Sequence, residues 1–172
     1  MIRIIMSVLA SVILSTSVFA QTNNKVKVYH GEVSIGDTFG LNCEYGSVLN
    51  FQTTHGVAYS DGAFVGAGIG VFTDMDYLLV PLFLKVSQTF CRNNTIKPYL
   101  SVSLGCYLIA PAGVSLYASP EFGIEISRFR LFSKYNSYQN TDHYYWQGDV
   151  GETIRSMTIG VAFRFGKNNL HP

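Results

Sequence analysis

The acidic and basic residues of the C-terminal half are the first candidates for chemistry. Glu121 and Glu125 are four positions apart, and Arg130 and Lys134 follow at the same spacing. Two neighbouring carboxylates can act as a general acid and a general base. If the segment 127–128 is instead a two-residue turn, Glu125 faces Arg130 and Glu121 faces Lys134 across antiparallel strands. Because each carboxylate then has a cationic partner, we expect a structural network rather than a catalytic carboxylate site.

The histidines and one glycine run are the other candidates. Glycine alternates with other residues over 66–70, but a phosphate loop requires a following helix, and none is predicted. His30 and His55 are too isolated to form a recognisable triad, and His143 has no Ser or Cys signature nearby. We therefore expect no catalytic residue, no cofactor and no metal site.

The elements that carry these residues are strands. The segment 156–165 alternates without a fault, and successive side chains of a strand point to opposite faces. One face holds Met157, Ile159, Val161, Phe163 and Phe165, and the other holds small residues and one arginine. Strands of about ten residues with an apolar outer face and a cramped polar inner face are typical of a transmembrane β-barrel.

The same alternation recurs along the chain between turn signals. It predicts eight strands, near residues 28–36, 47–59, 63–73, 77–89, 98–108, 114–126, 129–138 and 155–165. No later segment has helical periodicity or 18 consecutive apolar residues. The sequence therefore predicts an all-β fold, an eight-stranded antiparallel transmembrane up-and-down β-barrel. Pro81 and Pro120 fall inside predicted strands, where we expect bulges.

Alternation also assigns charged residues to the inner face of this barrel. They are Glu32, Lys85, Glu121, Glu125, Arg130, Lys134 and Arg164. Charges removed from bulk water must be paired, so we expect a charge network in the lumen. The interior of an eight-stranded barrel is only just wide enough for its side chains. With Phe64, Phe72, Tyr99 and Tyr117 also facing inward, we expect a filled, non-conducting lumen.

The N-terminus predicts secretion. Arg3 precedes an apolar run over 4–20 that ends in small residues, which is typical of a signal peptide. We expect residues 1–20 to be the signal peptide and 21–172 the outer-membrane barrel domain. Gln21 stands where a lipoprotein would need a cysteine.

Composition agrees with a membrane barrel. Charged residues make up 13% of the chain, against about 25–35% on a typical soluble surface. The net charge of +1 argues against a nucleic-acid partner.

The longest predicted connections, 37–46 and 139–154, face outside if both chain termini lie in the periplasm. Tyr135, Tyr138, Tyr144, Tyr145 and Trp146 surround the second of them. Tyrosine and tryptophan favour membrane interfaces, so these residues are expected to form an aromatic belt. In the alternative interpretation, Tyr144, Tyr145 and Trp146 form a surface-binding loop.

The three cysteines are expected to stay apart. The predicted topology puts Cys43 outside, Cys91 at the periplasmic rim and Cys106 on the lipid face. A disulfide needs Cα atoms within about 7 Å, which excludes a bridge between Cys43 and Cys91.

The chain resembles the small eight-stranded outer-membrane β-barrels of the OmpA-like or porin-like superfamily of Gram-negative bacteria. The resemblance covers nearly all of the expected mature chain and is carried by the segments 54–56, 62–70, 80–83, 120–123 and the final strand. It implies location in the outer membrane of the cell envelope. It also implies outer-membrane lipids and the outer-membrane assembly machinery as partners.

Three functions remain open at this point. The first is a structural or surface-interaction barrel without enzymatic activity. The second is a lipid-modifying enzyme of the lipid A deacylase or acyltransferase type, which would need His, Ser and a carboxylate together at one outer rim. The third is a secreted soluble barrel that binds an apolar ligand, as lipocalins do, with its apolar face inward.

Overall fold

The computed structural model describes residues 27–41, 47–73, 78–91, 93–109, 113–139 and 153–166. The expected signal peptide, Cys43, His143 and the three aromatic residues at 144–146 lie outside these ranges. No helix among the described residues is long and apolar enough to cross a membrane.

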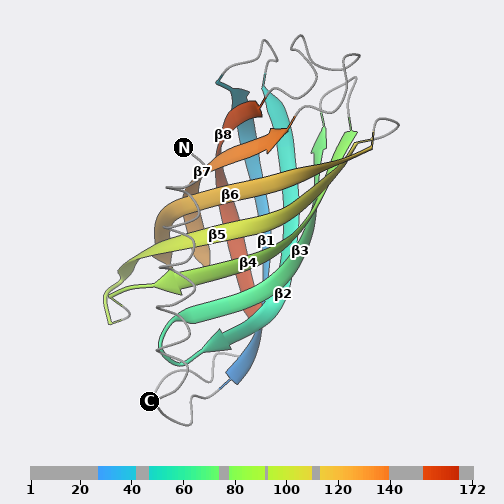
Figure 1. The fold of residues 1–172 in the computed structure, drawn as a ribbon. Helices are drawn as coiled ribbons and strands as arrows, with labels where there is room; N and C mark the ends of the chain where they lie inside the picture. Colours follow the sequence, from blue (N-terminus) through green and yellow to red (C-terminus); the bar gives the residue numbers. More distant parts are fainter. Residues whose placement is uncertain are drawn as a thin grey trace.

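Eight antiparallel strands close into one barrel, in which each strand pairs with the next along the chain and the last pairs with the first (Figure 1). They are β1 (Lys27–Gly40), β2 (Val48–Tyr59), β3 (Ala63–Thr73), β4 (Leu78–Thr89), β5 (Ile96–Ile109), β6 (Gly113–Ile126), β7 (Phe129–Gln139) and β8 (Thr153–Gly166). The expected fold class and all eight expected strands are therefore confirmed.

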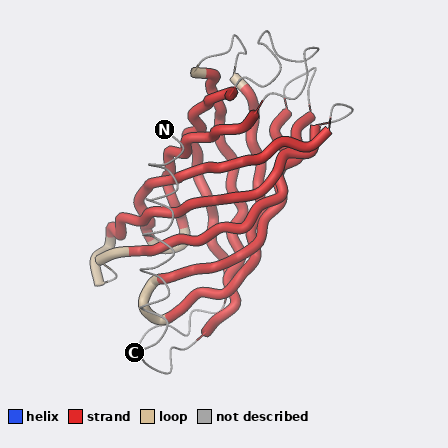
Figure 2. Tube along the Cα trace, in the orientation of Figure 1, coloured by secondary structure: helices blue, strands red, loops and turns tan. Residues whose placement is uncertain are grey.

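The two ends of the barrel differ, and we name them by their residues. The turn end carries the start of β1, the end of β8 and the segments 60–62, 90–95 and 127–128. The loop end carries the opposite strand ends, including Gly40, Val48 and Thr153. Figure 2 shows the tan turns at the lower left of the barrel, which is the turn end.

Strand β1 is longer than the alternation predicted. It continues to Gly40, and Asp37, which we interpreted as a loop residue, pairs with Leu49 of β2 and Ile159 of β8. The Asp37 carboxylate accepts a hydrogen bond from the Ser47 hydroxyl. The Asp37 side chain therefore has a hydrogen-bond partner within the longer strand pair.

The expected bulges at the two prolines are wrong. The β3–β4 ladder lacks its pairs beside Pro81, but Ile69↔Leu82 and Phe72↔Leu79 keep one register on both sides of the gap. The β6–β7 ladder behaves likewise beside Pro120. Each proline lacks the N–H that would donate to one ladder, but no extra residue is inserted into the strand as a bulge would require. On its other side each proline pairs in normal register with β5.

The barrel is apolar outside, and its charged side chains lie inside together with buried aromatic rings. The most exposed large side chains include Leu116 and Leu84, which are 79% and 66% exposed. Arg130 and Lys134 are only 1% and 2% exposed. Alternation along the strands therefore sorts the side chains onto two faces as the sequence predicted.

Candidate functional site

The centre of the lumen is a single chain of ion pairs with alternating charge. From the turn end, Arg164 bonds Glu125 with an Nη1–Oε2 distance of 2.6 Å, and Arg130 Nε bonds the same oxygen at 2.9 Å. The guanidinium of Arg130 continues to Glu32, with an Nη1–Oε2 distance of 2.9 Å. The Lys85 ammonium lies 2.7 Å from the other oxygen of Glu32.

The second half of the chain leads toward the loop end. Lys85 Nζ also lies 3.0 Å from Glu121 Oε1, and Glu121 Oε2 lies 3.5 Å from Lys134 Nζ. The chain ends where Lys134 donates to the Gln52 side-chain carbonyl at 2.6 Å. All seven residues that the sequence placed in the lumen thus lie in one network, which we call the ion chain.

Neighbouring polar and aromatic groups hold the ion chain in place. The Arg130 guanidinium carbon lies 4.1 Å from the centre of the Tyr99 ring, and the Tyr99 hydroxyl donates to Glu121 at 3.0 Å. Arg130 also donates to Thr89 at 3.2 Å. A buried guanidinium with its donors satisfied in this way is fixed in one orientation.

A layer of neutral hydrogen bonds joins β1, β6, β7 and β8. The Asn136 side-chain carbonyl accepts from Ser119 at 2.9 Å, and its amide donates to Thr158 at 2.9 Å. The hydroxyls of Thr158 and Thr38 are 2.8 Å apart. Asn136, Ser119 and Thr158 are fully buried, so these hydrogen bonds lie out of contact with solvent.

An aromatic cluster from five strands, β3 to β7, lies in the lumen. Tyr107 packs against Phe72, Tyr117 and Tyr138, with ring centroids 5.5, 4.6 and 4.8 Å apart. Phe83 packs on Tyr117 at 6.2 Å. The expected inward residues Phe64, Phe72, Tyr99 and Tyr117 are all buried.

The sequence analysis misplaced one tyrosine and missed several inward residues, among them Tyr107 and Lys97. Tyr138 was expected in the aromatic belt but is 4% exposed and lies in the lumen, whereas Tyr135 does face outward. The alternation of the strand predicts this orientation, because Tyr138 is four residues from the inward-facing Lys134 and therefore lies on the same face of β7. Tyr107 and Lys97 also face inward, and Lys97 was missed because it was interpreted as part of a turn.

A second polar cluster lies on the outer face, near the turn end. The Tyr29 hydroxyl lies 2.6 Å from His55 Nδ1, and the Thr53 hydroxyl lies 3.0 Å from His55 Nε2. Phe165 packs edge-on against the imidazole, with ring centroids 5.9 Å apart. The imidazole therefore has a hydroxyl at each nitrogen, and the expectation from the sequence that His55 is isolated is wrong.

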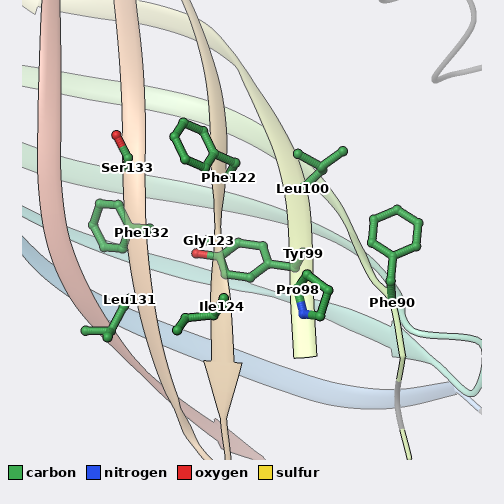
Figure 3. Close-up of a pocket in the computed structure, with 10 residues that line it drawn as sticks. All are labelled: Phe90, Pro98, Tyr99, Leu100, Phe122, Gly123, Ile124, Leu131, Phe132 and Ser133. Carbon is green, nitrogen blue, oxygen red and sulfur yellow. The ribbon is translucent and has the colours of Figure 1, made fainter. Parts of the chain in front are cut away.

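The outer wall also carries an apolar groove on β5, β6 and β7. Figure 3 shows Leu100 on one side of it and Leu131 on the other, with Phe122 on the strand between them and Tyr99 beside Gly123. A Cβ atom at Gly123 would stand 2.9 Å from the Tyr99 ring, so only glycine leaves room for the ring there. The groove is almost wholly apolar, so it suits apolar packing and carries no set of catalytic side chains.

Cysteines and metal ligands add no further site among the described residues. Cys91 is exposed in the β4–β5 turn and Cys106 is partly exposed on β5, and neither is in a disulfide. No group of three potential metal ligands occurs within the described part of the chain.

Comparison with known proteins identifies the fold. Neither a protein-family model nor a curated protein sequence matches this chain. The solved Neisserial surface protein A aligns over 84% of this chain and all of its own length, with a TM-score of 0.53 and 14% identity. The N-terminal β-barrel domain of Pseudomonas aeruginosa OprF aligns over 79% of this chain and 97% of its own, with a TM-score of 0.51 and 13% identity.

A third solved structure adds an enzyme to these similar folds. The outer membrane enzyme PagL aligns over 80% of this chain and 99% of its own, with a TM-score of 0.50 and 11% identity. At such identities the likeness concerns architecture alone. This chain has the closed eight-stranded barrel fold that is found in small outer-membrane proteins.

Proposed function

We propose that this chain is an integral outer-membrane protein with a filled lumen, and that its role is structural or one of surface interaction. The observation that carries the proposal is the inverted distribution of polarity. Charged side chains such as Arg130 are buried inside, and large apolar side chains such as Leu84 are exposed outside. An apolar band around a closed barrel matches the hydrocarbon layer of a bilayer.

The similar folds support the same location. One of the three similar structures is a surface protein and another is an outer membrane enzyme. A soluble lipocalin-like barrel would need its apolar side chains on the inner face to bind a ligand, which is opposite to the arrangement here. The proposed partners are the surrounding outer-membrane lipids and the machinery that inserts the barrel.

One substitution tests membrane insertion directly. Leu84 lies in the middle of β4 and is 66% exposed, so Leu84→Arg would be harmless on a barrel surrounded by water. In a bilayer we expect a loss of about 2–4 kcal/mol for an arginine at the midplane. Leu41, 55% exposed just beyond β1, is the matched control, because an arginine there can reach the interface.

The readout is urea unfolding of both variants in phospholipid bilayers. Our proposal requires the unfolding free energy of Leu84→Arg to be lower than that of Leu41→Arg. The difference should be at least half of the loss of about 2–4 kcal/mol expected for an arginine at the midplane. Equal stability of the two variants would reject membrane insertion.

A second candidate function rests on the outer polar cluster of Tyr29, Thr53 and His55. A hydroxyl beside an imidazole that is oriented by a third group is the arrangement of an activated nucleophile. Thr53 would be the nucleophile, His55 the base and Tyr29 the orienting group, at distances of 3.0 and 2.6 Å. Lying near the turn end, the cluster would face the periplasmic leaflet and act on a phospholipid acyl ester rather than on lipid A.

The test of this second candidate is acyl release from phospholipid vesicles by the reconstituted protein. Thr53→Val and His55→Gln should each abolish the release. Ser133→Ala, on the outer face of β7, should leave it unchanged. Absence of release by the unaltered protein would exclude this activity and leave the structural role.

A further inference from the structure

The lumen carries more positive than negative charge. Among the described residues, the inward-facing cations are Lys85, Lys97, Arg130, Lys134 and Arg164, and the inward-facing carboxylates are Glu32, Glu121 and Glu125. The ion chain both begins and ends with a cation. Buried charge without compensation is costly, so excess positive charge favours a bound anion.

The excess is concentrated at the turn end. Lys97 pairs across the sheet with Glu125, so its side chain shares the inner face with that carboxylate. Glu125 already accepts from Arg164 and from Arg130 through one oxygen, Oε2. Lys97 makes no ion pair with the described residues, and the Arg164 side chain is 15% exposed, so water at this end reaches the cations.

A buried imidazole without partners lies in the same region. His30 is 9% exposed, and neither of its ring nitrogens has a hydrogen-bond partner among the described residues. Its position on β1 is two residues from Glu32, which pairs across the seam with Arg164. Buried polar atoms are nearly always bonded, so two orphaned nitrogens indicate a missing partner.

Both cross-strand neighbours of His30 are glycines. His30 pairs with Gly56 of β2 on one side and with Gly166 of β8 on the other. Neither neighbour has a side chain to pack against the imidazole on the inner face. At Gly166 the φ angle is +139°, and a Cβ atom would stand 2.5 Å from the Tyr29 carbonyl oxygen, so this position requires glycine.

We propose that the turn end of the lumen binds a small oxyanion of the phosphate class, held by Lys97, Arg164 and His30. Lysine and arginine supply charge-assisted hydrogen bonds, and an imidazole N–H supplies a further donor. The inward orientation of all three suits a free anion that enters from the aqueous side. A lipid headgroup carries the same chemistry but would have to enter around the barrel rim.

Inorganic phosphate is the probe, with the whole protein folded in a phosphate-free neutral detergent. Phosphate should raise the urea midpoint saturably at constant ionic strength, because a ligand that binds only the native state stabilises it. Lys97→Gln is the principal variant, since Lys97 lies outside the ion chain and its loss leaves that chain intact. It should weaken phosphate affinity on the order of tenfold, the effect of one charge-assisted hydrogen bond.

Two further variants make the result specific. His30→Phe removes both orphaned nitrogens and should weaken phosphate binding similarly. Arg128→Gln removes an exposed cation in the β6–β7 turn and should leave phosphate affinity unchanged. No saturable effect in the unaltered protein, or equal losses in Lys97→Gln and Arg128→Gln, would overturn the proposal.

A second arm separates the two sources of the anion. The protein is reconstituted in bilayers of zwitterionic lipid and in bilayers containing anionic phospholipid, and the phosphate titration is repeated. Equal phosphate affinity in both bilayers supports a free anion in the lumen. Weaker apparent affinity in the anionic bilayer would show that headgroups compete, and would overturn the assignment to a free anion.

Discussion

Glu32 of β1 and Arg130 of β7 form an ion pair across the lumen, with 2.9 Å between Oε2 and Nη1, although their strands are not neighbours. The other oxygen of Glu32 binds Lys85 of β4. One carboxylate therefore links three strands that share no ladder. The backbone hydrogen bonds connect only adjacent strands, whereas these lumen ion pairs connect strands that are not adjacent in the barrel.

Removing a carboxylate from the ion chain should destabilise the barrel strongly. Glu125→Leu leaves Arg130 and Arg164 without a shared partner, and loss of one member of a buried pair costs about 3–5 kcal/mol. Arg164→Leu should cost less, because that side chain is 15% exposed and water screens the carboxylate it leaves. Urea unfolding in bilayers measures the stability of both variants. Unchanged stability in both would contradict a stabilising role of the ion chain.

The aromatic cluster should block ion flow. Tyr107 packs on Phe72, Tyr117 and Tyr138 across the lumen, and the Asn136 layer forms a second barrier. Purified protein in planar bilayers should therefore give no stable large conductance. The double variant Tyr107→Gly and Tyr117→Gly removes two rings of the aromatic cluster. It should therefore pass more current than the unaltered protein. A large, stable open channel from the unaltered protein would show that the lumen is not filled.

Gly68 of β3 and Phe83 of β4 should be energetically coupled. The two residues pair across the sheet, and a side chain at Gly68 would collide with the Phe83 ring. Gly68→Val should destabilise by about 1–3 kcal/mol, the usual cost of overpacking. In the Phe83→Ala background the same change should cost less. Additive effects in this double-mutant cycle would mean that the ring does not occupy the space over the glycine.

A surface phenotype, where one exists, should depend on the connection that follows β7. Replacement of Tyr144, Tyr145 and Trp146 by Ser should abolish surface binding while leaving the barrel folded, since aromatic residues dominate binding hot spots. Heat-modifiable gel mobility reports folding, and cell-surface binding reports the phenotype. Failure of the triple variant to assemble would identify these residues as interfacial anchors.

Much of the architecture was predictable because its determinants are local. The pair of Glu125 and Arg130 followed from one two-residue turn, since the turn sets the register of the two strands it joins. The contact of Glu32 with Arg130 did not follow, because it depends on how far each strand is displaced around the closed barrel. The partners of His55 were missed for a related reason: Tyr29 lies on the neighbouring strand, and we assigned no register between β1 and β2.

Closure of β1 on β8 has a kinetic consequence. Every other ladder joins strands that are consecutive in sequence, whereas this seam joins residues from Gly40↔Ser156 to His30↔Gly166. Non-local contacts pay the largest loop-closure entropy, so the seam should form late and limit the folding rate. Until it forms, Glu32 cannot lie opposite Arg164, and the lumen charges stay hydrated. Dehydration of the ion chain and completion of the cylinder should therefore occur as one cooperative step.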